Sequence, residues 1–329
     1  MNCFDNKHYL KSLGGDMTAA IEEKLNTTGA CLLGSGVYYV SGIRMPKGSA
    51  LIGMGNATKL VLLPEVESGA AVYINGFCTV KDLCVLGSEE NIELPEAVGD
   101  RHGIFFESDA DGKNWDDPRH PRNSIIEGCF ISSFTGGGIA GRDTGYSIHC
   151  AMTVSNCHIL NCGAGINLIH FSEYHQFTNV LCCENLYGCI NNGGNNDFVN
   201  CGFNANKIGF LIDNSQGQSN NNSHGSVVGC TFNHSDNNKG IGIILLGAKN
   251  GYVFSGCQMF YSKIVLDNSR NILFTGFNFG SNMEIGIKDC GLVMFNGNMF
   301  LGEPSISAEN VESLKFINCF NKDGSEIKI

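Results

Sequence analysis

The chain has 329 residues and a net charge of −11, with 43 glycines, 6 prolines and a single tryptophan. This acidic balance argues against a nucleic-acid groove or an anionic membrane surface as partner, because both require clustered Lys and Arg. The sequence contains no apolar run of about 18 residues, so it offers no candidate membrane span.

Residues 1–36 are predicted to form an N-terminal segment that carries a capping helix. Asp16 is expected to N-cap a helix through residues 18–25, which ends at Gly29. Ile21 and Leu25 lie four residues apart and would share its apolar face. A solenoid exposes core and unpaired strand edges at its end, so we expect this helix to act as the lid.

Four stretches near the C-terminal end repeat every 20 to 21 residues and begin at Phe254, Phe274, Phe295 and Phe316. A second series runs in register with them, through Ile243, Ile264, Ile285 and Ile306. The residues between alternate apolar and polar, which is strand periodicity, and Gly, Asn, Ser and Asp separate the runs. Repetition at this period predicts a solenoid.

The same strand position extends towards the N-terminus with insertions, through Val72, Ile104, Ile139, Ile166, Cys189 and Phe210. We therefore predict an all-β fold, a single-stranded right-handed parallel β-helix of about ten coils over residues 37–329. Insertions are expected at about 87–102, 107–123, 141–150, 169–174 and 213–224. Asn161, Asn185, Asn206 and Asn238 precede successive strands, and we expect their side chains to bond from coil to coil.

Many of the 16 cysteines recur at one repeat position, through Cys129, Cys157, Cys201 and Cys230. Stacked in successive coils, they would be buried free thiols whose parallel side chains suit a disulfide poorly. The sequence begins Met1-Asn2-Cys3 without a basic and apolar leader, so we expect cytoplasmic synthesis without a signal peptide. The Cys and His spacings match no zinc site, so neither a metal nor a cofactor is expected.

Several N-terminal motifs carry a family resemblance. They are Asp16-Met17-Thr18-Ala19-Ala20-Ile21, Gly36-Val37-Tyr38-Tyr39-Val40, Pro46-Lys47-Gly48 and Leu51-Ile52-Gly53-Met54-Gly55. Over about residues 16 to 63 the chain resembles the pectate-lyase-like superfamily, which includes bacteriophage tailspikes and polysaccharide depolymerases. The resemblance implies a right-handed β-helix, often a homotrimer, that acts on complex carbohydrate. The polygalacturonase motif and the calcium-binding Asp cluster of pectate lyases are absent, which disfavours those two activities.

Four of the insertions follow the strands of Ile104, Ile139, Ile166 and Phe210. Equivalent positions of successive coils stack, so these loops are expected to share one edge, where solenoids usually place function. They carry residue types that suit a sugar site: aromatic faces, Arg groups and carboxylates. The predicted substrate-binding residues are Trp115, Arg122, Tyr146, His149, His170 and Tyr174.

The preferred catalytic pair is Asp143 and Glu173, one coil apart. Two carboxylates could act as general acid and as base or nucleophile in glycoside hydrolysis. On a uronate polymer a lyase reaction competes, in which Arg142 neutralises the substrate carboxylate and His175, His170 or Tyr146 abstracts a proton. Taken singly, each of these residues is also compatible with an ordinary surface or packing role.

Two functions therefore follow from the sequence. The first is a polysaccharide-degrading glycoside hydrolase or lyase of tailspike type. The second is a non-catalytic receptor-binding or structural β-helix, such as a virion fibre or tail component. The missing leader favours a virion-associated protein, and the expected partners are a polysaccharide and two further copies of the chain in a homotrimer.

Overall fold

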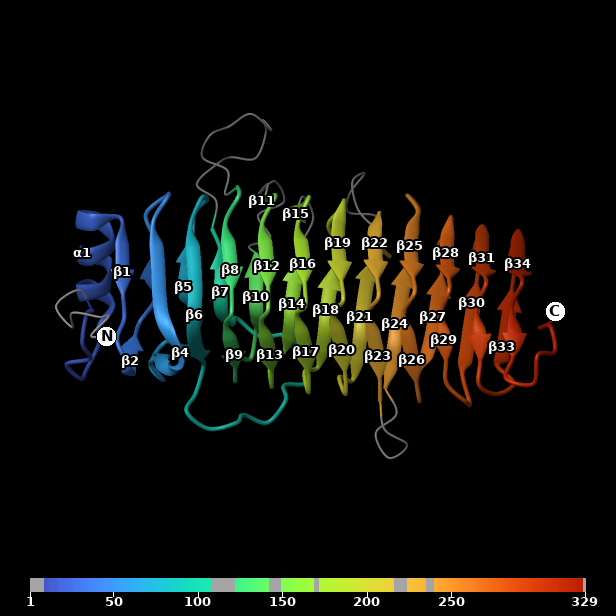
Figure 1. Cartoon of the computed structure of the whole chain (residues 1–329), viewed down its shortest axis with the longest axis horizontal. Coiled ribbons are helices and arrows are strands. Elements are labelled where there is room, and N and C mark those ends of the chain that lie inside the picture. The colour runs from blue at the N-terminus through green and yellow to red at the C-terminus, as the bar shows by residue number, and fades with distance from the viewer. Residues whose placement is uncertain are drawn as a thin grey trace, which may run out of the picture.

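The computed structural model is an elongated solenoid of stacked coils, with the helix at one end and the C-terminal strands at the other (Figure 1). It describes residues 9–107, 122–141, 149–168, 172–215, 224–234 and 240–327. Each pairing between its named strands is parallel, and the coils form a right-handed parallel β-helix, as predicted.

One face of the solenoid is an 11-stranded sheet, to which each coil contributes one strand. Its strands are β3 (Ile43–Arg44), β5 (Gly69–Ile74), β7 (Arg101–Phe106), β10 (Gly137–Gly141), β14 (Ala164–Leu168), β18 (Tyr187–Asn191), β21 (Ile208–Asp213), β24 (Ile241–Leu246), β27 (Lys263–Asp267), β30 (Glu284–Lys288) and β33 (Ser305–Glu309). The predicted strand series is confirmed, because Val72, Ile104, Ile139, Ile166 and their successors to Ile306 are register partners.

The other two faces belong to a 22-stranded sheet that bends at a corner in every coil. The first stack holds β1 (Ala30–Leu32), β8 (Ile125–Glu127), β12 (Thr153–Ser155), β16 (Gln176–Thr178), β19 (Asn196–Val199), β22 (Gly225–Val228), β25 (Tyr252–Ser255), β28 (Ile272–Thr275), β31 (Leu292–Asn296) and β34 (Ser313–Ile317). The second holds β2 (Gly36–Val40), β9 (Phe130–Ser132), β13 (His158–Leu160), β17 (Leu181–Cys183), β20 (Gly202–Asn204), β23 (Thr231–Asn233), β26 (Gln258–Phe260), β29 (Asn278–Phe279), β32 (Met299–Phe300) and β35 (Phe320–Asn321). The long strands β4 (Ala50–Leu62) and β6 (Thr79–Leu86) belong to both stacks.

The core of the C-terminal coils is a column of stacked phenylalanines. The rings of Phe254, Phe274, Phe295 and Phe316 lie nearly parallel, with successive centroids 5.0, 4.9 and 4.6 Å apart. The repeat seen in the sequence is thus a packing repeat, since one ring per coil stacks on the ring of the next coil.

The repeated cysteines line the corner between the two stacks. They follow a residue in the left-handed backbone region, such as Asn200 before Cys201 and Gly229 before Cys230. The buried thiols of Cys201 and Cys230 donate to backbone carbonyls, and the Cys201 N–H donates to the Cys230 sulfur at 3.2 Å. The cysteines whose side chains the structure describes are all free thiols, as predicted.

The lid is α1 (Thr18–Thr28), and it buries Ile21 and Leu25 as expected. Asp16 is not its N-cap: Met17 occupies that position, although the Asp16 carboxylate accepts the Thr18 N–H at 2.9 Å. Asp16 instead forms an isolated parallel bridge with Tyr39, which fixes its backbone to the first coil. In the part of the chain that the structure describes, no helix has the length and apolar character to cross a membrane.

The predicted asparagine ladder is confirmed in part. The Asn206 side chain accepts the backbone N–H of Asn185 at 2.9 Å, and Asn185 accepts the N–H of Cys162. Asn161 departs from the prediction, because the ladder position in its coil is Cys162. Its amide instead bonds the backbone of Ile92 twice and holds the 87–100 segment against the solenoid. Asn238 lies outside the described residues.

Candidate functional site

The strands that flank four of the predicted insertions meet at the same corner of the coil. Residues 108–121, 142–148, 169–171 and 216–223 each fall between a strand of the 11-stranded sheet and the following strand of the first stack. We call this corner the loop edge. The short strands β11 (His149–Cys150) and β15 (Ser172–Glu173) pair along it, and Gly194 of the next coil pairs with Glu173. The 87–100 segment joins the end of β6 to β7, and it therefore lies at a different corner, between the second stack and the 11-stranded sheet.

Half of the ten predicted site residues fall in these insertions. Trp115, Arg142, Asp143, Tyr146 and His170 lie outside the described residues. His149 belongs to β11, where its backbone is the partner of Ser172. The assignment of these residues to catalysis and substrate binding therefore stays a prediction.

Glu173 is at the loop edge, but it is only 1% exposed. Its side chain accepts a hydrogen bond from the Asn195 amide at 3.2 Å. In the neighbouring core, the fully buried Asn196 amide donates to the Ser172 carbonyl and to the Asn191 Oδ1, both at 2.9 Å. The sequence placed Glu173 in an open loop, whereas the structure buries it in the short strand β15.

His175 does not face solvent. Its ring is fully buried between Phe106 and Phe177, with both centroid distances at 6.3 Å, and its Nδ1 accepts the Met152 N–H at 3.2 Å. A proton of a polymeric substrate cannot reach this position, so the predicted role of His175 as a base is wrong. The reason is a turn in the backbone. Tyr174 adopts the left-handed conformation, which directs the side chain of the next residue, His175, into the core.

Tyr174 is accessible to a ligand, whereas two of the Arg122 side-chain nitrogens are buried. Tyr174 is 55% exposed on the loop edge. Arg122 is half-buried where the chain leaves residues 108–121, and its Nε and Nη2 atoms have no hydrogen-bond partner among the described residues. Its backbone carbonyl accepts the Phe77 N–H at 2.6 Å, which fixes it to the preceding coil.

Among the described residues, a concave surface lies across the outer faces of β3, β5 and β7, and we call it the outer groove. Two adjoining cavities, of about 310 and 450 Å³, share Arg44, Tyr73 and Glu107. The second cavity also contains His102 and Phe105. Arg44, Tyr73 and Phe105 occupy the same outward register position in successive strands, so three coils build one surface.

The contacts of the outer groove combine aromatic faces with opposite charges. The Arg44 guanidinium lies 4.2 Å from the Tyr73 ring centroid and pairs with the Glu107 carboxylate. The Tyr73 hydroxyl accepts the Ala70 N–H at 2.9 Å, and its ring meets Phe105 edge to face at 5.9 Å. Such a surface offers a flat apolar face, hydrogen-bond donors and a carboxylate to one ligand.

His102 lines the outer groove as a neutral imidazole. Burial of the ring lowers the pKa of His102 from 6.5 to about 4, and the nearby Asp100 carboxylate offsets this effect only in part. Its Nδ1 accepts the Gly137 N–H at 2.9 Å, so the proton of the neutral ring is on Nε2. His102 can therefore donate a hydrogen bond to a ligand, but it is not placed to act as a base.

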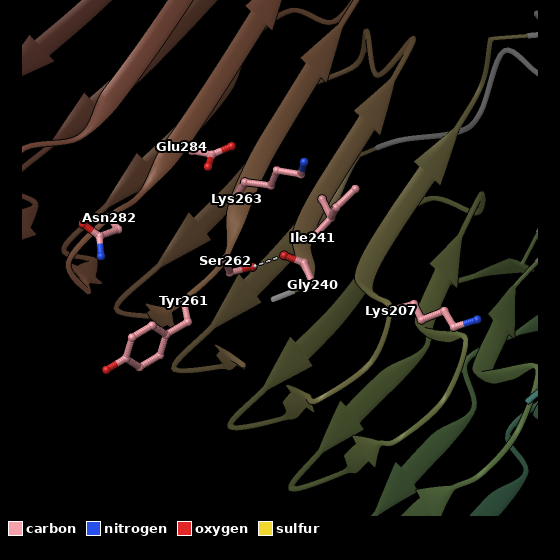
Figure 2. A pocket seen from close by; sticks show the side chains of 8 residues that line it. All are labelled: Lys207, Gly240, Ile241, Tyr261, Ser262, Lys263, Asn282 and Glu284. Carbon is pink, nitrogen blue, oxygen red and sulfur yellow. Dashed lines mark hydrogen bonds between the residues drawn. The ribbon is translucent and has the colours of Figure 1, made fainter. Parts of the chain in front are cut away.

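A smaller cavity of about 240 Å³ lies in later coils, at the corner between the second stack and the 11-stranded sheet. Lys207, Tyr261, Lys263, Asn282 and Glu284 are among its lining residues (Figure 2). In Figure 2 the Tyr261 ring and the Lys207 ammonium point in opposite directions rather than towards one another. Since these groups do not converge, the outer groove is the better candidate site. The described residues contain no group of three or more potential metal ligands.

The sequence reasoning missed Arg44, Tyr73, Phe105 and His102. A signal was present, because the first three each follow a member of the core series: Ile43, Val72 and Ile104. In a strand the residue after a core position points outward. Reading the outward column along with the core column would have found an Arg and two aromatic residues in consecutive coils.

Comparisons with known proteins bear on the fold. No protein-family model matches the sequence, and no curated protein matches it closely enough to count as a relative. Among solved structures, the mannuronan C-5 epimerase A-module of Azotobacter vinelandii matches with a TM-score of 0.65 and 14% identity, over 93% of this chain and 95% of the module.

Two phage proteins match as well. The N-terminal fragment of bacteriophage Phi29 gene product 12 has a TM-score of 0.62 and 14% identity, over 94% of this chain and 64% of its own. A tailspike double mutant of E. coli bacteriophage HK620 has a TM-score of 0.62 and 12% identity, over 95% and 63%. This chain has the parallel β-helix fold that these structures share. It spans less than two thirds of either phage chain.

Proposed function

We propose that this chain is a carbohydrate-active β-helix protein that binds a polysaccharide in the outer groove and along the loop edge. The observation that carries the proposal is the outer groove itself, in which Tyr73 and Phe105 lie beside Arg44, Glu107 and His102. Aromatic rings accept the apolar faces of sugars, and the charged groups bond hydroxyl or acidic substituents. The likeness to an epimerase of mannuronan and to a tailspike is consistent with such a ligand.

The reaction that we propose is glycoside hydrolysis by Asp143 and Glu173 at the loop edge. The Asn195 amide fixes the orientation of the Glu173 carboxyl, as a positioned acid or base requires. Since Glu173 is buried, the substrate would have to enter the edge above β15 to reach it. A lyase reaction would use Arg142 with His170 or Tyr146, because His175 is enclosed in the core.

The test is incubation of the protein with capsular, uronate and neutral polysaccharides, with Glu173→Gln and Asp143→Asn as variants. We expect new reducing ends from the wild type and a loss of at least about a hundredfold in either variant. Glu184→Gln, an exposed carboxyl in the same coil, is the matched control and should keep full activity. Ultraviolet absorbance of unsaturated products would instead identify a lyase, and unaltered activity in both variants would refute the pair.

A non-catalytic binding protein is the second candidate, and one observation favours it. Glu107, the carboxylate of the outer groove, is already paired with Arg44. A paired carboxylate positions a ligand more readily than it transfers a proton. Binding of a polysaccharide without any product would support this alternative.

We further propose a virion-associated homotrimer, with subunit contacts on the outer face of the 11-stranded sheet. Ile190, Leu211, Ile244 and Val265 occupy one outward register position there, in four successive coils. Such an apolar stripe on a half-buried face suits the heterologous contacts that close a three-fold ring. Light scattering should give three times the mass of 35.4 kDa, and a monomeric mass would contradict the proposal.

A further inference from the structure

The charges that line the outer groove do not balance. Among the described residues of its two cavities, Arg44 is the one cation, whereas Asp100 and Glu107 are carboxylates. His102 adds no charge near pH 7, because burial of its ring lowers its pKa to about 4. The lining is therefore net negative at neutral pH.

Arg44 is already engaged by other groups of the chain. Its guanidinium pairs with the Glu107 carboxylate and lies over the Tyr73 ring, 4.2 Å from the ring centroid. A sugar carboxylate could reach Arg44 only by displacing Glu107, and the displaced carboxylate would remain beside it in the same cavity. Because like charges at short range repel, the ion pair opposes an acidic ligand.

The surface that borders the groove is acidic as well. Segments 63–68 and 87–100 both reach the 11-stranded sheet at the corner where Ser68 and Asp100 line the second cavity. They contain neither Lys nor Arg, and their exposed carboxylates are those of Glu65, Glu67, Glu89, Glu90, Glu93, Glu96 and Asp100. The next cation along the chain, Arg101, lines neither cavity, and its Nη2 donates to the Leu63 and Gly87 carbonyls. The field at this end of the groove therefore repels anions.

The same lining suits a sugar that carries hydroxyl groups only. The Tyr73 and Phe105 rings meet edge to face and offer apolar surface to the faces of sugar rings. Sugar hydroxyls donate hydrogen bonds, and the Asp100 and Glu107 carboxylates accept them. The His102 Nε2–H can donate to a hydroxyl oxygen, because the Nδ1 of this ring accepts a backbone N–H. A uronate carboxylate only accepts, so it has no hydrogen bond to give to Asp100 or Glu107.

We propose that the outer groove selects a neutral polysaccharide over a uronate polymer, and that Asp100 and Glu107 set this specificity. This selectivity rests on the proposed carbohydrate function, of which it names the substrate class. It also bears on the reaction. A lyase abstracts a proton beside a uronate carboxylate, so a neutral substrate leaves hydrolysis as the reaction of this chain.

The test compares each acidic polymer with its carboxyl-reduced form, which keeps the linkages but has a hydroxymethyl group in place of every carboxylate. Polygalacturonate, polymannuronate and acidic capsular polysaccharides are immobilised in both forms, and binding of the full-length protein is measured at pH 7. We expect the recognised polymer to bind at least about tenfold more tightly in its reduced form at about 20 mM NaCl. The difference should narrow at about 150 mM NaCl, because salt screens the repulsion.

Two variants assign this preference to the groove. Asp100→Asn and Glu107→Gln each remove one carboxylate at nearly constant size, and Glu107→Gln also releases Arg44 from its ion pair. Each should lower the ratio of the two affinities about fivefold. Glu309→Gln removes the same charge from an exposed position of β33, in the last coil, and should keep the wild-type ratio. Urea unfolding checks that each variant is folded.

Each other outcome has a defined meaning. If the wild type binds an acidic polymer more tightly than its reduced form, the selectivity is refuted and the proposed function stands. If Asp100→Asn and Glu107→Gln both keep the wild-type ratio, these carboxylates do not set the specificity and the inference is wrong. If the wild type binds neither form of any polymer, the proposed function fails, and the inference fails with it.

Discussion

The C-terminal coils and the N-terminal coils share one strand pattern, but they differ in regularity and in the residues on their outer surface. From β25 onward the coils repeat every 20 to 21 residues, and a column of stacked phenylalanines fills their core. The coils of β3, β5 and β7 are irregular in length, and their outward positions carry Arg44, Tyr73 and Phe105. Regular repetition thus accompanies uniform packing, and departures from it accompany chemically distinctive surfaces.

The largest effect should come from breaking the regular half. Phe274→Ala removes a fully buried ring that stacks on both neighbours, and we expect the free energy of unfolding to fall by about 3–5 kcal/mol. Urea unfolding measures the loss. Phe320→Ala, on the outside of the last coil, should cost much less because its ring is partly exposed. Equal costs for the two variants would show that the phenylalanine column is not what stabilises these coils.

A smaller and pH-dependent effect should come from the irregular half. The pKa of His102 is about 4 in the folded chain and 6.5 in the unfolded chain, because the buried ring resists protonation. Between these values the unfolded state binds a proton that the native state does not, so stability is lost as the pH falls from 6.5 towards 4. The loss from this group should reach about 3 kcal/mol.

Urea unfolding at pH 7 and pH 4 measures this dependence in the wild type and in His102→Asn. Asparagine keeps a side-chain acceptor for the Gly137 N–H but has no group that titrates in this range. The variant should lose about 3 kcal/mol less than the wild type between the two pH values. The same pH dependence in both proteins would mean that His102 is protonated without cost in the folded chain.

The fold could be predicted from the sequence more completely than the candidate site. The series from Val72 to Ile306 and the column from Phe254 to Phe316 gave the strand register coil by coil, because each coil repeats one packing unit. The site depended on which side chains face outward and which turns reverse that direction. The fate of His175 was therefore misjudged: a single left-handed residue, Tyr174, directs it into the core.

The sequence by itself determined the solenoid, its lid and its free cysteines. These follow from period, alternation and turn residues, which are local properties repeated along the chain. Only the tertiary structure decided that Arg44, Tyr73 and Phe105 form one surface and that Glu173 is enclosed. The physical reason is that insertions of unequal length separate these residues in sequence, while stacking brings them to neighbouring coils at one spacing.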